Sequence, residues 1–202
     1  KILRPYSVVS APHEPFMEFF LELVPEGALS TKLWTMELSD EVWIRNRVVG
    51  RFTLDDEREH RRRHLMTATV TGIAPYISMI RHQQHLLETG RLDEPHEMLI
   101  IQGASYTPEF GLYGEELEEA DGNGWLEYIP TVSRPWEDES WDGEVGRVED
   151  VVRKYADERG YDHESAIGYT CGHPQMIEKV KDILRRARFD DEFIREEKYF
   201  ID

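Results

Sequence analysis

The spacing of apolar residues changes near residue 58 of this sequence. Beyond that point, short apolar runs alternate with longer segments in which apolar residues recur every three or four positions. The runs predict buried strands, and the longer segments predict amphipathic helices. The expected strands are residues 65–70, 98–103, 126–132 and 166–171, and the expected helices are residues 75–87, 113–120, 147–159 and 174–188.

This alternation predicts the architecture of the second part of the chain. Strands joined by helices of roughly 10–15 residues form right-handed βαβ crossovers, which place the strands parallel in one sheet. No internal repeat or low-complexity segment interrupts the pattern. We therefore expect an α/β domain with a parallel sheet over residues 59–202.

The first 58 residues have a different pattern. The expected strands here are residues 5–10, 16–24 and 41–52, and a short helix is expected at residues 29–36. The charged run at residues 55–63 contains no candidate core residue and predicts a linker. We therefore expect a β-rich region over residues 1–58, joined to the α/β domain.

Composition limits the class of protein. The chain has 202 residues, of which 40% are hydrophobic and 11% aromatic, as in a globular protein of one large or two small domains. Its one cysteine excludes an internal disulfide and a four-thiolate metal or iron–sulfur site. No apolar run approaches about 18 residues and no signal peptide is visible, so we expect a cytoplasmic protein without a membrane partner.

Charge argues against one class of partner and suggests another. The net charge is -17, which disfavours nucleic acid as a partner. Arginines nevertheless gather in one part of the sequence, namely Arg45, Arg47, Arg51, Arg58, Arg61, Arg62 and Arg63. This run is either a set of solvated side chains or a docking patch for an acidic protein or an anionic ligand.

A glycine and a proline stand at the junction between the strand at 65–70 and the next helix, in Thr71-Gly72-Ile73-Ala74-Pro75. Glycine permits a tight turn and lets a ligand approach the backbone, and proline suits the first helical turn. The N–H groups at the positive end of the helix then suit a pyrophosphate. The alternative is a plain strand–helix turn, and the usual G-x-G-x-x-G fingerprint of dinucleotide sites is absent from the sequence.

A second junction of this kind, Cys171-Gly172-His173-Pro174, follows the strand at 166–171. In open parallel sheets, ligands bind outside the carboxyl ends of the strands, so the two junctions are expected at the same edge. Cys171 is either a buried small apolar residue or a functional side chain at that edge.

Arginines next to hydroxyl groups occur at two further places. Ser133 and Arg134 follow the strand at 126–132, and Arg147 can converge with them on a phosphate monoester. In Arg4-Pro5-Tyr6-Ser7, an arginine, an aromatic ring and a hydroxyl can bind a phosphate, cover a flat ring and donate a hydrogen bond. Each set also has a plain alternative, a surface loop in the first case and an ordinary strand in the second.

These four motifs, in this order, resemble the ferredoxin–NADP reductase family in its shorter bacterial form. The R-x-Y-[ST] motif of that family corresponds to Arg4, Tyr6 and Ser7, and its G-x-x-S turn corresponds to Gly27-Ala28-Leu29-Ser30. Its T-G-[IV]-A-P and C-G-x-P motifs correspond to the two junctions. The resemblance implies an antiparallel FAD-binding β-barrel, followed by an NADP-binding domain with a parallel sheet.

The resemblance also implies roles for individual residues. FAD would be bound by Arg4, Pro5, Tyr6, Ser7, Gly27, Leu29 and Ser30. NADP would be bound by Thr71, Gly72, Ala74, Pro75, Ser133, Arg134, Arg147, Cys171, Gly172 and Pro174. An aromatic residue of the C-terminal segment, Tyr199 or Phe200, would cover the flavin or the adenine. Ser7 would bond near flavin N5, Cys171 would shape the nicotinamide pocket, and Glu196 or Glu197 would relay a proton.

The implied activity is electron transfer between NADPH, used in preference to NADH, and a one-electron carrier such as ferredoxin or flavodoxin. The arginine run would then dock that carrier. The family's barrel has six strands, with R-x-Y-S on about the fourth, so the strands before it are not in this sequence. Two alternatives follow: a reductase component that serves an oxygenase or free flavin, and a non-catalytic module that binds a nucleotide or a protein.

Overall fold

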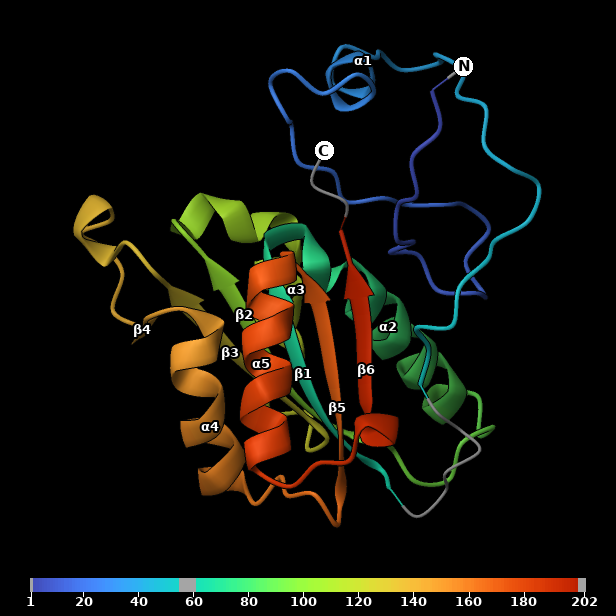
Figure 1. Cartoon of the computed structure of the whole chain (residues 1–202). Helices are drawn as coiled ribbons and strands as arrows, with labels where there is room; N and C mark the ends of the chain where they lie inside the picture. The colour runs from blue at the N-terminus through green and yellow to red at the C-terminus, as the bar shows by residue number, and fades with distance from the viewer. Residues whose placement is uncertain (1, 55–60, 200–202) are drawn as a thin grey trace.

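Parallel strands form the centre of the second part of the chain. The computed structural model describes residues 2–54 and 61–199, and within them six strands form one sheet in the order β4-β3-β2-β1-β5-β6 (Figure 1). Every neighbouring pair in this sheet is parallel. The strands are β1 (Arg63–Thr69), β2 (Glu97–Ala104), β3 (Leu126–Val132), β4 (Glu144–Val145), β5 (Ala166–Gly172) and β6 (Ile194–Lys198).

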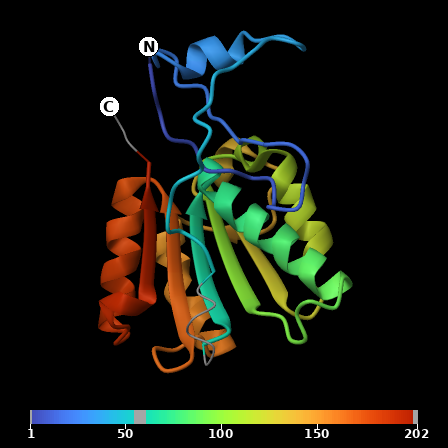
Figure 2. The same ribbon diagram turned by 90° about the vertical axis from the view of Figure 1, so that its right-hand side faces the viewer.

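Helices cover both faces of the sheet. One face carries α2 (Ala74–Glu88) and α3 (Gly111–Ala120), and the other carries α4 (Val148–Arg159) and α5 (Pro174–Arg186) (Figure 2). Successive residues of a strand point to opposite faces, so β1 supplies Met66 to one core and Leu65 to the other. Because both faces are covered, the central strands β1, β2 and β5 are buried at nearly every position rather than at alternate positions. Short 3₁₀ helices complete the connections: η1 (Val70–Ile73), η2 (Thr107–Phe110), η3 (Pro135–Glu137) and η4 (Asp191–Phe193).

The strand order reverses its direction at β1. From β1 the chain passes through α2 to β2 on one side, whereas β5 pairs with the other side of β1 and is followed by α5 on the opposite face. Ligands of open parallel sheets bind at such a switch point, outside the carboxyl ends of the two strands. The predicted junctions follow these two strands.

The predicted strands and helices of the α/β region are confirmed, with ends that shift by a few residues. The sequence pattern missed β4 and β6, which are the edge strands of the sheet. In β6 only Ile194 is buried, so no apolar run marks the strand. Its position comes from pairing with β5 and from an ion pair between Glu196 and Lys181 of α5 at 2.5 Å.

The amino-terminal region differs from the prediction. Among residues 2–54 the structure has the short helix α1 (Ser30–Trp34) and an isolated antiparallel bridge between Val8 and Phe19, but no strand. The strands predicted at 5–10, 16–24 and 41–52 are therefore wrong for these residues, and they form no barrel here. A strand needs a hydrogen-bonded neighbour, which these segments do not give each other beyond that bridge. The predicted boundary at residue 58 lies outside the described residues.

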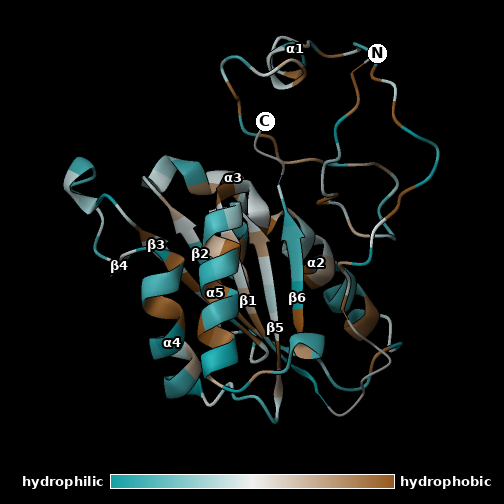
Figure 3. Cartoon of the chain, viewed as in Figure 1, coloured by the Kyte–Doolittle hydropathy of each residue, from teal (hydrophilic) through white to brown (hydrophobic). Residues whose placement is uncertain are grey.

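Part of this region packs on the α/β domain and part stands away from it. The Phe52 ring lies 5.5 Å from Tyr169 and 5.8 Å from Tyr76, and the Tyr169 hydroxyl donates a 3.2 Å hydrogen bond to the Thr53 carbonyl. Val9 is also fully buried in the core on the side of α2 and α3, whereas the segment with α1 lies beyond the carboxyl edge of the sheet (Figures 1 and 2). Figure 3 shows apolar stretches along this extended chain. Within residues 2–54 and 61–199, no helix has the length and apolar character needed to cross a membrane.

Candidate active site

Two strand–helix junctions touch at the carboxyl edge, where β1 and β5 end. A Cβ atom added to Gly72 would overlap the carbonyl oxygen of Cys171. Gly172 has a φ of +120°, and its Cα faces the hydroxyl of Thr69, which accepts a 2.8 Å hydrogen bond from the backbone N–H of His173. The close approach of the neighbouring strand therefore requires a glycine at position 72. The approach of a ligand to this backbone stays a prediction.

The turn after β1 is held from several sides. Val70 has a φ of +45°, a left-handed conformation that a β-branched residue rarely adopts. Its carbonyl accepts a 3.0 Å hydrogen bond from the Gln102 amide of β2, and the Tyr76 hydroxyl of α2 donates to the Thr67 carbonyl at 2.9 Å. Pro75 lies in the first turn of α2, as predicted. Backbone strain of this kind persists where the surroundings fix it, often at functional sites.

The last strand brings Glu197 and Tyr199 to the same edge. Glu197 pairs in register with Cys171 across the β5–β6 ladder. The Tyr199 backbone N–H donates to the Gly172 carbonyl at 3.1 Å, and its hydroxyl donates to the Thr71 carbonyl at 2.7 Å. Tyr199 thus joins both junctions. Its predicted contact with the flavin or the adenine stays a prediction. Phe200, the other candidate, lies outside the described residues.

Ser7 reaches this cluster from the amino-terminal region. Its hydroxyl donates a hydrogen bond to Oε1 of Glu197, and it also lies beside the Tyr199 hydroxyl. The three residues expected to be catalytic, Ser7, Cys171 and Glu197, therefore come from distant parts of the sequence to one place.

The Cys171 thiol lies inside this cluster and is fully buried. Burial is the main cause that raises the pKa of the thiol above its usual range, and the nearby Glu197 carboxylate adds to the effect. The thiol is therefore protonated at neutral pH. Because the thiolate is the reactive form, burial disfavours a nucleophilic role for this cysteine.

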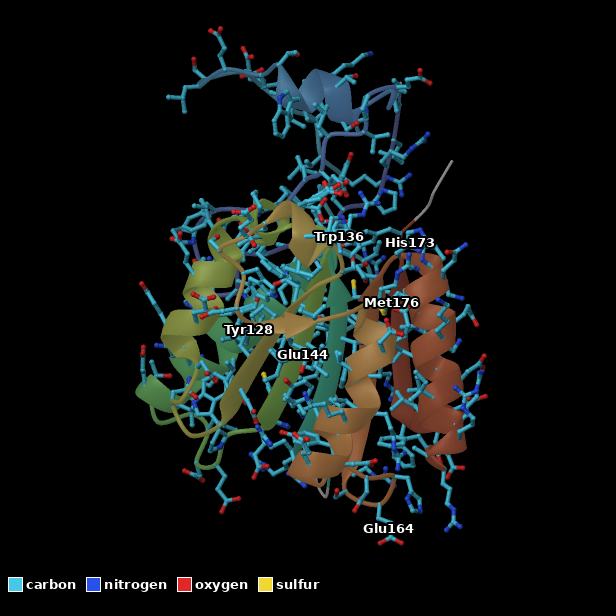
Figure 4. All side chains as sticks on the ribbon, turned by 90° about the vertical axis from the view of Figure 1, so that its left-hand side faces the viewer. Tyr128, Trp136, Glu144, Glu164, His173 and Met176 are labelled. Atoms are coloured by element: carbon cyan, nitrogen blue, oxygen red, sulfur yellow. The ribbon has the colours of Figure 1, made fainter. Side chains whose placement is uncertain are left out.

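The residues predicted for a phosphate monoester lie along the same edge, after β3. The Ser133 hydroxyl donates to the Ala104 carbonyl at 3.3 Å, and the Arg134 guanidinium bonds the Tyr106 hydroxyl and lies 5.3 Å from the ring centre. Arg147 is exposed and directly precedes α4. Its neighbour Gly146 donates a 3.0 Å hydrogen bond from its N–H to the Val132 carbonyl. In Figure 4, Trp136 of η3 and His173 lie at this end of the domain, and Glu164 lies at the opposite end.

The motifs expected to bind a flavin lie on the amino-terminal region. Arg4 and Pro5 are exposed, and Tyr6, just before Ser7, is 37% exposed. The turn with Gly27 and Leu29 is closed by the Ser30 hydroxyl, which donates to the Val24 carbonyl at 3.1 Å. This turn leads into α1, which Figure 1 places beyond the edge of the sheet, apart from the cluster around Cys171.

The arginine run does not form one patch. Arg61 donates to the His163 and Ala166 carbonyls at 2.7 and 3.0 Å, and Arg63 donates to the Gly160 carbonyl at 2.6 Å. Arg62 bonds a backbone carbonyl, that of Glu94. These three lie at the amino end of β1, about 20 Å from its carboxyl end at about 3.3 Å per residue. The others, Arg45, Arg47 and Arg51, are exposed on the amino-terminal region, and Arg58 lies outside the described residues.

Sequence reasoning missed Thr69 and Tyr106. Thr69 holds the Cys171–Pro174 junction through the His173 N–H, and Tyr106 supports the Arg134 guanidinium. The strand pattern could have identified both residues, because Thr69 ends β1 and Tyr106 lies just past the end of β2. Each is a polar residue at the carboxyl end of a predicted strand.

Comparisons with known proteins agree with this arrangement. The model of a family described as the oxidoreductase NAD-binding domain matches residues 66–182, which is more than half of the chain. The chain is 30% identical over 186 residues to a flavodoxin/ferredoxin–NADP reductase of Escherichia coli (strain K12), and the match covers 88% of this chain and 69% of that protein. The chain belongs to the ferredoxin–NADP reductase family.

Other members of the ferredoxin–NADP reductase family support the assignment. A flavodoxin/ferredoxin–NADP reductase of Buchnera aphidicola is 28% identical over 189 residues, with 91% of this chain and 72% of that protein covered. A solved ferredoxin NADP+ reductase from Neisseria gonorrhoeae has a TM-score of 0.77 at 22% identity and covers 96% of this chain and 79% of its own. That likeness shows that the fold is shared.

The family match extends from β1 to α5. It therefore includes both junctions, from Thr71 to Pro75 and from Cys171 to Pro174, together with Ser133, Arg134 and Arg147. Ala74 begins α2 and Pro174 begins α5, so both helices start at the touching junctions. The fold thus brings the residues predicted to bind NADP to one edge of the sheet.

Proposed function

We propose that this chain is an FAD-dependent oxidoreductase that transfers electrons between NADPH and a one-electron carrier such as ferredoxin or flavodoxin. Residues 59–202 bind NADP, and residues 1–58 contribute to the flavin side. The observation that carries the proposal is the cluster of Ser7, Cys171, Glu197 and Tyr199 at the switch point of the sheet. Membership in the reductase family supports the same activity.

The residues at the carboxyl edge fit a phosphorylated dinucleotide. The first turn of α2 follows Thr71 and Gly72, and N–H groups at a helix start suit a pyrophosphate. Ser133, Arg134 and Arg147 supply a hydroxyl and two guanidinium groups for the 2′-phosphate, which only NADP carries. The Tyr106 ring under Arg134 holds that guanidinium in place.

The amino-terminal residues fit the phosphate and ring of a flavin nucleotide. Arg4 and Tyr6 are both exposed, so a cation and an aromatic ring lie at the surface next to Ser7 in the sequence. The turn at Gly27, Leu29 and Ser30 provides backbone N–H groups for the pyrophosphate. When bound, FAD accepts a hydride from the nicotinamide and releases single electrons.

The protein's own groups orient the reaction and move the proton. Ser7 donates its hydroxyl hydrogen to Glu197, which is half-buried and so connects the site to solvent. The neutral Cys171 thiol forms part of the wall for the nicotinamide. Tyr199 covers the two junctions and must move if a ring is to lie against Cys171, because its hydroxyl bonds the Thr71 carbonyl.

The carrier docks on the amino-terminal region. Arg45, Arg47 and Arg51 are exposed there, close in sequence to the exposed side chains of Trp43 and Val48. Cations that steer an acidic protein, next to apolar side chains that pack against it, are common features of protein interfaces. Arg61, Arg62 and Arg63 take no part in this surface.

A direct test uses the full chain with added FAD. We expect flavin absorption after removal of free FAD, oxidation of NADPH much faster than of NADH, and reduction of ferredoxin or flavodoxin. A colourless protein would favour a non-catalytic module and overturn the proposal. If the protein is yellow but reduces only free flavin, it is a flavin reductase instead.

A further inference from the structure

The amino-terminal region is held to the α/β domain by a charged cluster on the face that carries α2 and α3. Its centre is Arg81 of α2, whose side chain is 22% exposed. The guanidinium of Arg81 donates hydrogen bonds to both carboxylate oxygens of Glu116 on α3, from Nε to Oε1 and from Nη2 to Oε2, each at 2.7 Å. Its Nη1 donates to Oε2 of Glu18 at 2.6 Å and lies 3.6 Å from Oε2 of Glu14.

Other contacts hold the same turn of the amino-terminal region. The Tyr113 hydroxyl of α3 donates to the other oxygen of Glu18 at 2.9 Å, and the Tyr113 ring packs edge-on against Phe20 at 5.0 Å. The Ser78 hydroxyl of α2 donates to the Ser10 carbonyl at 2.9 Å. The turn is thus attached to two helices through both its side chains and its backbone.

This turn carries Ser7. The bridge between Val8 and Phe19 joins its two arms, and the Val9 N–H donates to the Glu18 carbonyl at 2.9 Å. Ser7 directly precedes the bridge and reaches Glu197. A shift of Glu18 therefore moves Ser7 relative to the Cys171 cluster.

We propose that Arg81 is a positioning residue that fixes Ser7, and with it the flavin-binding residues, relative to the nicotinamide side of the site. The inference rests on the proposed function, and it assigns a role to a residue that touches neither nucleotide. Three carboxylates from two regions converge on this one guanidinium. A planar fork can hold two of them in a set geometry, which the single ammonium of a lysine cannot do.

The test compares Arg81→Lys with a matched control, Arg159→Lys. Arg159 of α4 also bonds one carboxylate, that of Glu127, with Nε 2.9 Å from both oxygens and Nη2 2.8 Å from one, but α4 lies on the opposite face of the sheet. Amide hydrogen exchange is measured for residues 8–20 and for β5. In Arg81→Lys we expect exchange on the order of tenfold faster in residues 8–20 and unchanged in β5. Unchanged exchange in residues 8–20, or equally faster exchange in β5, overturns the inference.

A second readout follows flavin reduction by NADPH in a single turnover, with FAD added. For Arg81→Lys we expect a rate lower by on the order of 10- to 100-fold, because small misplacements cost this much, with NADP affinity unchanged. Arg159→Lys retains the wild-type rate. Loss of NADP affinity together with rate would mean general damage and would overturn the role.

A second variant, Glu18→Gln, tests the same contact from the amino-terminal side. If Arg81→Lys does not fold, Glu18→Gln replaces it, with the same expected exchange pattern and Glu127→Gln as its control. If the wild-type chain binds no flavin, the proposed function fails, and the exchange measurement still decides whether Arg81 holds the turn that carries Ser7.

Discussion

The two regions of this protein bury their apolar side chains very differently. In the α/β region, Ile100 and Tyr169 are fully buried in the core between sheet and helices. In the amino-terminal region, Leu38 is 99% exposed and Trp43 is 87% exposed. Exposed apolar side chains that lie together are typical of surfaces that contact a ligand or another protein, which is what we propose for this region. The α/β region therefore stabilises itself, whereas the amino-terminal region depends on a few attachments.

One of those attachments lies in the proposed site, namely the bond from Ser7 to Glu197. The others include the Arg81 cluster, the burial of Val9 in the core and the packing of Phe52 on the sheet. Most of the free energy of folding thus comes from the α/β core, whereas the attachments place the flavin side. We therefore expect mutations in the core to change the free energy of unfolding, and mutations at the attachments to change the alignment of the two halves of the site.

The largest expected difference between the regions is in the free energy of unfolding after a buried or an exposed side chain is shortened to alanine. Ile100→Ala should lower the free energy of unfolding by about 3 kcal/mol, because it leaves a cavity in a fully buried core. Leu38→Ala should change it by no more than about 0.5 kcal/mol, because the side chain is exposed. Urea unfolding of both variants measures the contrast, and equal losses would show that the amino-terminal region has a core of its own.

The next largest effect on the free energy of unfolding is expected at Gly72, where the backbones of the two junctions touch. Gly72→Ala should lower the free energy of unfolding by about 2 kcal/mol, because the new methyl group overlaps the Cys171 carbonyl. Gly90→Ala is the control: no atom lies within 4 Å of the added Cβ, and only its left-handed φ of +65° is strained, at about 1 kcal/mol. A smaller loss for Gly72→Ala than for Gly90→Ala would contradict the close contact.

How much of this could be predicted from the sequence differs between the same two regions. In the α/β region, strands with helices on both faces are rich in apolar residues, so the pattern located β1, β2, β3 and β5. The exceptions are the edge strands. Charged β6 is held by pairing with β5 and by ion pairs with α5, and neither is visible in local sequence.

In the amino-terminal region the same method was wrong. Residues 5–10 and 16–24 have strand-like composition, but a strand also needs a paired neighbour, and here only Val8 and Phe19 meet. The candidate site residues were predicted for another reason. Ser7 and Cys171 belong to ordered motifs, and Glu197 was predicted from its place in the C-terminal segment, so none of the three depended on regular secondary structure. Arg81 belongs to no motif, because its role arises only from the carboxylates that the fold gathers around it.

A smaller effect separates the two nucleotides. Arg134→Ala should lower kcat/KM for NADPH on the order of tenfold and leave kcat/KM for NADH unchanged, because a charge-assisted bond to the 2′-phosphate is lost. Arg186→Ala is the control, since this exposed arginine lies in the last turn of α5, at the other end of the helix from the site. Equal losses with both nucleotides would remove Arg134 from the 2′-phosphate site.

The smallest expected effect is a dependence of the attachment on pH. Burial by itself would raise the pKa of Glu18, but hydrogen bonds from Arg81 and Tyr113 outweigh it and hold that pKa below its ordinary value. A group with a lowered pKa stabilises the folded state fully above its ordinary pKa, about 4.3 for glutamate, and loses the effect as pH falls through the folded value. Amide exchange in residues 8–20 should therefore be constant, relative to β5, from pH 7 to about 5 and should rise below about 4. Glu18→Gln stays neutral throughout, so its exchange should lack this rise. If the variant and the wild type follow the same profile, another group controls the attachment, and the ion pair with Arg81 is not what ties the amino-terminal region to the sheet in acid.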